Sequence, residues 1–152
     1  MEEGPQAQEA GARSAQGGGE GSDSKLVDVP FAIEQIDHVT ITAPSELEAE
    51  VLRWYREVLG LDEIDKPEGT RSQGAWFRAG SQQLHVTRDE HNPPKTAHFG
   101  IVVDDFGRAV EHLRAAGCHM EQAREIPGRR RCFTRDPAGN GIEIMCFDSE
   151  QE

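Results

Sequence analysis

The sequence predicts an α+β domain made of two tandem βαβββ modules, and two observations lead to this prediction. One strand, one helix and three strands follow each other twice between residues 31 and 149. Polar residues also recur at matching places. His38 and His98 lie 60 residues apart in the first strand of each half, and His85 and Glu143 lie 58 residues apart in the last strand. Near-equal offsets at corresponding elements are typical of a duplicated module.

The first module is predicted over residues 31–90. Its "IDHVTIT" segment alternates in polarity, which predicts a strand over residues 36–42. Ser45 followed by Glu48 has the form of a capping box, and the apolar residues after it recur at helical spacing. Gly60 is the expected end of this helix. Three short strands are then predicted in "DEIDK", "GAWFRAG" and "SQQLHVTRD".

The second module is predicted over residues 96–149 and repeats this order. "AHFGIVV" predicts a strand, Asp104 or Asp105 is the expected N-cap of a helix, and Gly117 is the expected stop. The last three strands are predicted in "HMEQAR", "RCFTRD" and "GIEIMCF". The basic run at residues 129–131 is interpreted as a solvated loop rather than an anion site.

Composition limits the function classes. Residues 1–30 form an acidic, Gly-rich tail with too few apolar residues to fold, so disorder is expected there. The formal net charge of -12 argues against nucleic acid or an anionic membrane as a general partner. No apolar run is long enough to span a bilayer. Three cysteines without paired spacing fit a reduced, cytoplasmic compartment.

The central question of the sequence is Glu143, a carboxylate within the almost wholly apolar strand "GIEIMCF". Burying it without a partner would cost several kcal/mol. Taken singly, His38, His85 and His98 each have an ordinary structural interpretation. If the two modules face each other, however, the three imidazoles and Glu143 meet at one point, and a divalent ion there would neutralise the carboxylate. The four residues are therefore predicted metal ligands.

The segments "IDHVTI", "WYREVLGL", "QQLHVT", "AHFGIVVDD" and "FTRDPAGNGIEIM" resemble the vicinal oxygen chelate superfamily. This superfamily includes glyoxalase I, extradiol dioxygenases, fosfomycin-resistance enzymes and bleomycin-binding proteins. The resemblance spans nearly all of the expected folded part, 31–149. It implies a glyoxalase-like fold, in which the curved mixed sheets of the two modules form a cleft. It also implies metal ligands on the first and last strands of each module.

The resemblance leaves several activities open. The leading one is a metal-dependent, glyoxalase-like lyase or isomerase that binds neighbouring oxygens of a small-molecule substrate, with Glu143 as proton carrier and one divalent ion (Fe, Ni, Zn or Mn). Glyoxalase I-like members usually carry a glutamate where this chain has His85, so the chain departs from their pattern. An Fe(II)-dependent extradiol dioxygenase is one alternative. A metal-free binding or resistance protein is the other.

Three further expectations concern the cleft and the assembly. Exposed sheet edges and a half-open cleft favour a homodimer, in which ligands are shared between chains in some arrangements. Trp76 and Phe77 are candidates for either cleft wall or core. Arg131 is a candidate to meet a substrate carboxylate.

Overall fold

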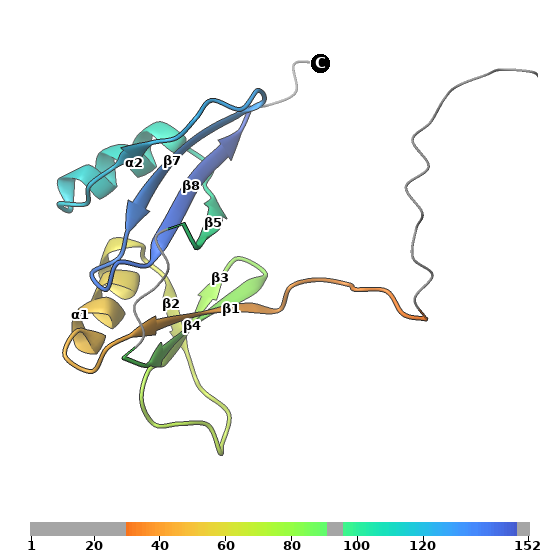
Figure 1. The fold of residues 1–152 in the computed structure, drawn as a ribbon, viewed down its shortest axis with the longest axis vertical. Helices are drawn as coiled ribbons and strands as arrows, with labels where there is room; N and C mark the ends of the chain where they lie inside the picture. The colour runs from red at the N-terminus through yellow and green to blue at the C-terminus, as the bar shows by residue number, and fades with distance from the viewer. Residues whose placement is uncertain (1–29, 91–95, 149–152) are drawn as a thin grey trace, which may run out of the picture. The chain divides into compact units, whose positions relative to one another are not determined.

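The computed structural model describes residues 30–90 and 96–148 of the 152-residue chain. Nearly all of the tail expected at residues 1–30 lies outside this part. The remaining elements form two mixed four-stranded sheets with few helices, as Figure 1 shows. The predicted α+β class is therefore confirmed.

The first sheet has the strand order β1-β4-β3-β2. Its first strand pairs in parallel with its last, and the other pairs are antiparallel. The strands are β1 (His38–Ala43), β2 (Asp62–Ile64), β3 (Ala75–Ala79) and β4 (Gln82–Arg88).

The second sheet repeats this arrangement in the order β5-β8-β7-β6. Again the first strand pairs in parallel with the last. The strands are β5 (His98–Val102), β6 (Glu121–Gln122), β7 (Arg129–Arg135) and β8 (Gly141–Phe147). The predicted repeat of one strand, one helix and three strands thus matches the observed order of elements.

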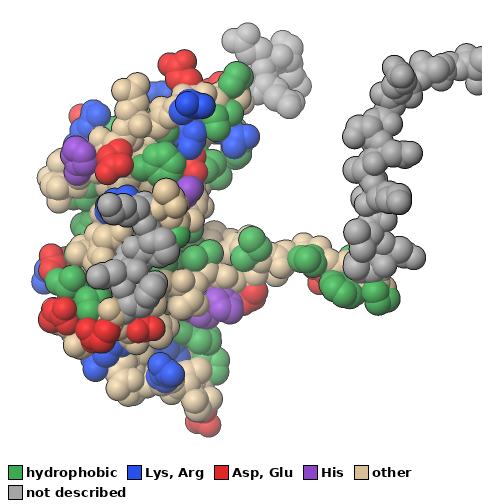
Figure 2. Space-filling view, in the orientation of Figure 1, with side chains coloured by type: hydrophobic (Ala, Val, Ile, Leu, Met, Phe, Trp, Pro, Cys, Tyr) green, Lys and Arg blue, Asp and Glu red, His purple; other side chains and the backbone are tan. Residues whose placement is uncertain are grey.

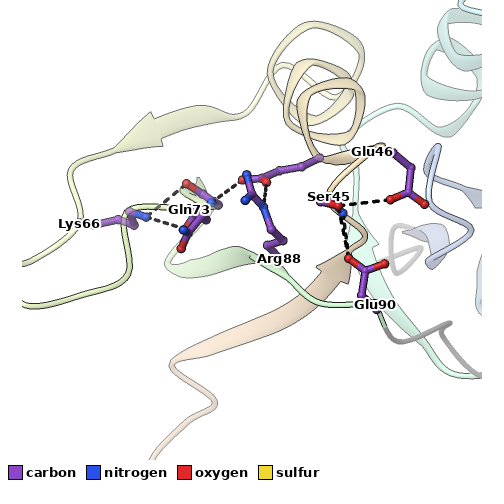
Figure 3. Close-up of polar contacts among 8 residues, drawn as sticks. Ser45, Glu46, Lys66, Gln73, Arg88 and Glu90 are labelled. Carbon is purple, nitrogen blue, oxygen red and sulfur yellow. Dashed lines mark hydrogen bonds and ion pairs between the residues drawn. The ribbon is translucent and has the colours of Figure 1, made fainter.

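The helix of the first module differs from the prediction at its start, whereas its predicted end is confirmed: Gly60 follows the C-cap Leu59 and has a φ of 68°. α1 (Glu48–Arg53) begins after Leu47, which makes no side-chain cap, and it continues into a π-helical turn, η1 (Trp54–Val58). The predicted capping box is wrong, because the Ser45 hydroxyl contacts Glu46 and Glu90 instead of the helix start (Figure 3).

The helix of the second module, α2 (Phe106–Ala115), follows the sequence closely. Asp105 is its N-cap, and the side chain accepts a hydrogen bond from the backbone N–H of Arg108. Gly117 has a φ of 85°, which glycine adopts readily at a helix end. None of the described helices is long and apolar enough to cross a membrane.

Side chains alternate along each strand, so one face of each sheet packs into the core. The opposite face is termed the open face. In the first sheet, Phe77 and Val86 are buried together with Val51 of α1. In the second sheet, Ile142 and Ile144 are fully buried. Residues next to these in sequence, including Trp76, therefore lie on the opposite face. Phe77 belongs to the core and Trp76 does not.

A buried hydrogen-bond network joins the two modules. The hydroxyl of Tyr55 donates to Oδ2 of Asp136 at 2.9 Å, and Nδ2 of Asn140 donates to the same oxygen at 2.7 Å. Nδ2 of Asn140 also donates to the carbonyl of Thr42 in β1 at 2.9 Å. The turn between β7 and β8 is thereby tied to both the helix and the first strand of the other module.

The basic run Arg129–Arg131 is not a loop, so that interpretation is wrong. These residues open β7 and pair in register with Phe147, Cys146 and Met145 of β8. Pairing with an apolar strand orders the run despite its three like charges.

Tyr55 is the single tyrosine of the chain, so its ionisation can be followed alone. Burial and the neighbouring Asp136 raise the pKa of its phenol well above the ordinary 10.0. The stability that the phenol contributes is therefore fully present below pH 10.0 and is lost only as the pH rises toward the folded-state pKa. In an alkaline titration, tyrosinate absorbance should appear together with the loss of the circular dichroism signal of the fold.

The matched variant is Tyr55→Phe, which should show no tyrosinate signal. It should also lower the free energy of unfolding by about 2 kcal/mol, because Asp136 loses a buried donor. Tyrosinate that forms near pH 10.0 in a protein with native circular dichroism would contradict this account of the network.

Candidate metal-binding site

The first predicted pair, His38 and His85, lies on the open face of the first sheet. In the parallel pairing of β1 with β4, Thr40 lies opposite His85, so His38 is two residues earlier on the same face. The two imidazole rings are stacked, with centroids 4.2 Å apart. Trp76 stacks on His85 at 3.8 Å, almost parallel to it. The three rings therefore form one continuous stack.

Both imidazoles of this pair are oriented by polar neighbours. Nδ1 of His38 contacts the Asp37 carboxylate at 2.8 Å, and Nε2 of His85 contacts the side-chain oxygen of Gln83 at 2.8 Å. His85 is buried, and burial together with nearby His38 lowers its pKa. His85 is therefore neutral at pH 7, which is the form of imidazole that binds a metal.

The second pair, His98 and Glu143, occupies the equivalent place in the second sheet. Gly100 lies opposite Glu143 in the pairing of β5 with β8, so His98 is again two residues earlier on the same face. Nε2 of His98 lies 3.3 Å from Oε2 of Glu143, and Nδ1 of His98 contacts the carbonyl of Thr96 at 2.9 Å. A ring-edge contact with Phe133 fixes the imidazole further.

Arg131 provides the positive charge next to Glu143. Its Nε donates to Oε1 of Glu143 at 2.5 Å, and only 15% and 12% of the two side chains are exposed. Nη1 of Arg131 also donates to the carbonyl of Arg124 at 3.0 Å. Arg131 thus contacts a carboxylate of the protein itself, whereas the sequence suggested a carboxylate of the substrate.

The structure groups the four predicted ligands as two pairs. Each pair joins the first and last strands of its own sheet at the same register. Within residues 30–90 and 96–148 of one chain, no three His, Cys, Asp or Glu side chains lie close enough together to hold a metal ion. The four-ligand set therefore stays a prediction.

Each pair borders a hollow on the protein surface. His85 and Trp76 line one of about 580 Å³, together with Lys66, Arg71 and Arg88. His98 lines another of about 310 Å³. Both hollows are large enough for small molecules or parts of them.

A network around Glu48 holds one wall of the larger hollow, in the segment between β2 and β3. Glu48 accepts a hydrogen bond from the backbone N–H of Gly74 at 2.7 Å and pairs with Arg88. Lys66 donates to the carbonyls of Arg71, Gln73 and Gly74. Figure 3 shows Lys66 next to Gln73. Gly74 has a φ of 76°, and a Cβ there would lie 2.0 Å from the carbonyl oxygen of Val86. The sequence gives no signal for the role of Lys66, because its partners are backbone carbonyls that every residue has.

The pairing of Arg131 with Glu143 can be measured by a double-mutant cycle in chelator-treated protein, using Arg131→Met and Glu143→Gln. A coupling of about 1–3 kcal/mol is expected in the free energy of unfolding, because both groups are largely shielded from water. The control cycle uses Arg56 and Glu63, an ion pair whose side chains are 47% and 44% exposed. Its coupling should be about 0.5 kcal/mol or less. Equal couplings in the two cycles would show that burial adds nothing to the Arg131 pair.

Comparisons with known proteins identify the family of the chain. The sequence model of the glyoxalase/bleomycin resistance protein/dioxygenase superfamily matches residues 35–144. Glyoxylase I 4 of Arabidopsis thaliana is 27% identical over 132 residues, covering 79% of this chain and 75% of that protein.

Solved structures agree with this match. A Bacillus anthracis protein assigned to the glyoxalase family is 33% identical, with a TM-score of 0.74 over 79% of this chain and 100% of that chain. Lactoylglutathione lyase of Agrobacterium tumefaciens shares the fold, with 24% identity and a TM-score of 0.61 over 76% of this chain and 96% of that chain. The resemblance found in the sequence is confirmed: the chain belongs to the glyoxalase/bleomycin resistance protein/dioxygenase superfamily and has its fold.

Proposed function

We propose that this protein is a metal-dependent enzyme of small molecules, a glyoxalase-like lyase or isomerase whose substrate carries neighbouring oxygens. The observation that carries the proposal is the equivalence of the two polar pairs. In each sheet, the first and last strands pair in parallel and carry two side chains of metal-binding type on the open face. The two side chains are offset by the same number of residues in both sheets. A structural requirement of one module would not by itself put such a pair in both.

The four side chains suit a divalent ion chemically. His38, His85, His98 and Glu143 offer three imidazoles and one carboxylate, a set that Fe, Ni, Zn and Mn accept. His85 is held neutral, and the Asp37 contact at Nδ1 of His38 is the kind of support that fixes a ligating imidazole. A bound ion would supply Lewis acidity toward the two substrate oxygens.

Within the protein, Glu143 is the residue proposed to move a proton. Arg131 holds its Oε1, which fixes the direction of the carboxylate. Oε2 makes the longer contact, 3.3 Å to His98, so it is the oxygen that would bind an ion and that, once released from it, would accept a proton from a substrate carbon. The first pair consists of two imidazoles, so Glu143 of the second module is the only carboxylate among the four residues that could transfer the proton.

We also propose that two copies of the chain combine their pairs. His38 and His85 of one copy would then face His98 and Glu143 of the other, so that a homodimer would hold two complete sites. Each pair alone supplies two ligands, whereas three or four protein ligands are usual for zinc and related ions. The open sheet edges at β1 and β5 leave room for such an assembly.

A second candidate function is a metal-free small-molecule binding protein, and Arg131 favours it. The guanidinium of Arg131 already balances the charge of Glu143, so an ion is not required to compensate this shielded carboxylate. In this case the stacked rings of Trp76, His85 and His38 would form the floor of a binding site for a flat molecule.

Metal analysis separates the two functions. Protein purified without a histidine tag should bind about one Ni, Zn, Mn or Fe ion per chain. His98→Ala or Glu143→Gln should weaken binding at least about 100-fold, because each removes a ligand. His119→Ala, which removes an exposed histidine outside the two pairs, should leave it unchanged. A wild-type protein that takes up none of these ions would favour the metal-free function, and O₂ consumption with a catechol would favour the dioxygenase.

Mixed dimers test whether the site is shared. A His38→Ala chain and a His98→Ala chain carry different non-histidine tags and are purified together. If ligands are shared, one site of the mixed dimer loses both histidines and the other stays complete. The mixed dimer should therefore bind one ion tightly, whereas neither mutant homodimer should do so. A mixed dimer that binds no ion would place all four ligands of a site in one chain.

A further inference from the structure

We propose that a hollow at the start of β7 binds the oxyanion group of a small molecule, either a carboxylate or a phosphoryl group. This hollow, termed the arginine hollow, has a volume of about 410 Å³ and lies between the segment at residues 122–128 and the first residues of β7. Its lining includes Arg124, Arg129, Arg130, Arg131, Phe106 and Ile126.

Aromatic rings position the arginines of this hollow. The guanidinium of Arg129 lies 5.0 Å from the ring centre of Phe147, and that of Arg130 lies 4.8 Å from the ring centre of Phe106. Cation–π contacts hold a guanidinium in place, and because the ring is neutral, the positive charge is not cancelled. The N–H groups at the edge of each guanidinium plane then remain able to bind an anion.

Arg124, Arg129 and Arg130 are not neutralised by a carboxylate within the part of the chain that the structure describes. No ion pair joins any of the three to a carboxylate there, whereas Arg131 is paired with Glu143. The carboxylates of Glu125 and Asp148 also line the hollow. Because Arg131 is paired with Glu143, the other three arginines leave a net positive charge of one. In a chain with a formal net charge of -12, this cluster opposes the overall sign. Figure 2 shows Lys and Arg side chains beside hydrophobic ones at the end of the molecule where β7 begins and β8 ends in Figure 1.

The backbone around the hollow is fixed by its own hydrogen bonds. Ile126 and Arg129 form a bridge across Pro127 and Gly128, and Gly128 has the φ of 81° that the third residue of a type II turn requires. The carbonyl of Gly128 accepts from the backbone N–H of Asp148 at 3.0 Å. A fixed frame reduces the ordering cost of binding a ligand.

The chemistry of the hollow indicates a small acid. Two N–H groups of one planar guanidinium can bind two oxygens of the same carboxylate or phosphate. The apolar surface of Phe106 and Ile126 suits a carbon skeleton next to the anion. The strongly acidic chain disfavours a polyanion such as nucleic acid, because only this small region is basic.

The hollow has a defined relation to the candidate metal-binding site. Arg129 and Arg131 lie on the same face of β7, two residues and therefore about 7 Å apart, and Arg131 contacts Glu143, whereas Arg130 between them points to the other face, toward Phe106. A substrate that presents neighbouring oxygens to Glu143 would place its acidic group about this distance away. This assignment of the anion to the substrate rests on the proposed function, whereas anion binding itself does not.

The test uses full-length protein that is stripped of metal and then freed of chelator. Inorganic phosphate and succinate are titrated separately by calorimetry at constant ionic strength, because surface charge effects vary with salt. Saturable binding of at least one is expected, and the one that binds identifies the oxyanion as phosphoryl or carboxylate. Arg129→Gln combined with Arg130→Gln should weaken binding at least tenfold.

The matched control combines Arg53→Gln with Arg114→Gln, two exposed arginines outside the hollow with the same total charge change. It should bind like the wild type. Arg129→Lys with Arg130→Lys keeps the charge without the planar fork and should bind with intermediate affinity. Absence of saturable binding, or equal losses in the two glutamine variants, would overturn the proposal. Because no metal is present, this failure is distinct from a failure of the metal-dependent function.

Discussion

The parallel pairing of the first and last strands within each sheet determines where every candidate ligand lies. Parallel strands need a long crossover, and here the helix and two further strands provide it. Register then decides the chemistry, because a shift by one residue turns each side chain to the other face. Val86 and Ile144 are buried in the core, so their neighbours His85 and Glu143 lie on the open faces. Core packing thus indirectly fixes the position of the polar pairs.

Three carboxylates that lie largely out of water show how this fold accommodates charge. Glu48 and Glu143 each pair with an arginine, Arg88 and Arg131. For Glu48, burial raises the pKa, but the hydrogen bonds from a backbone N–H and the arginine outweigh burial and lower it overall. Asp136 is surrounded by neutral donors, and there burial prevails and raises the pKa. The direction of the pKa shift thus depends on the balance between burial of the carboxylate and the hydrogen bonds and charges around it.

The order of strands and helices along the chain, the helix stop at Gly117 and the strand positions of the four polar residues follow from periodicity, glycine positions and repeat spacing, which can be read from the sequence directly. Partners far apart in the chain do not. Glu48 has the spacing of a cap residue, yet its carboxylate binds Gly74 and Arg88, 26 and 40 residues away. Arg131 likewise has no local signal for Glu143 in the next strand. Such contacts depend on how strands pair and on which turns bring them together, which an alternation of polar and apolar residues does not specify.

Glu143 connects the two candidate functions. A guanidinium and a divalent ion can both neutralise a carboxylate, and in this geometry they need not compete. Arg131 holds Oε1, whereas Oε2 makes only the 3.3 Å contact with His98. Coordination through Oε2 would replace that contact and leave the arginine in place, as a support for the ligand. The metal-dependent and metal-free functions therefore require the same residues around Glu143. They differ in whether an ion at Oε2 is also bound by His38 and His85, which we propose a second copy of the chain supplies.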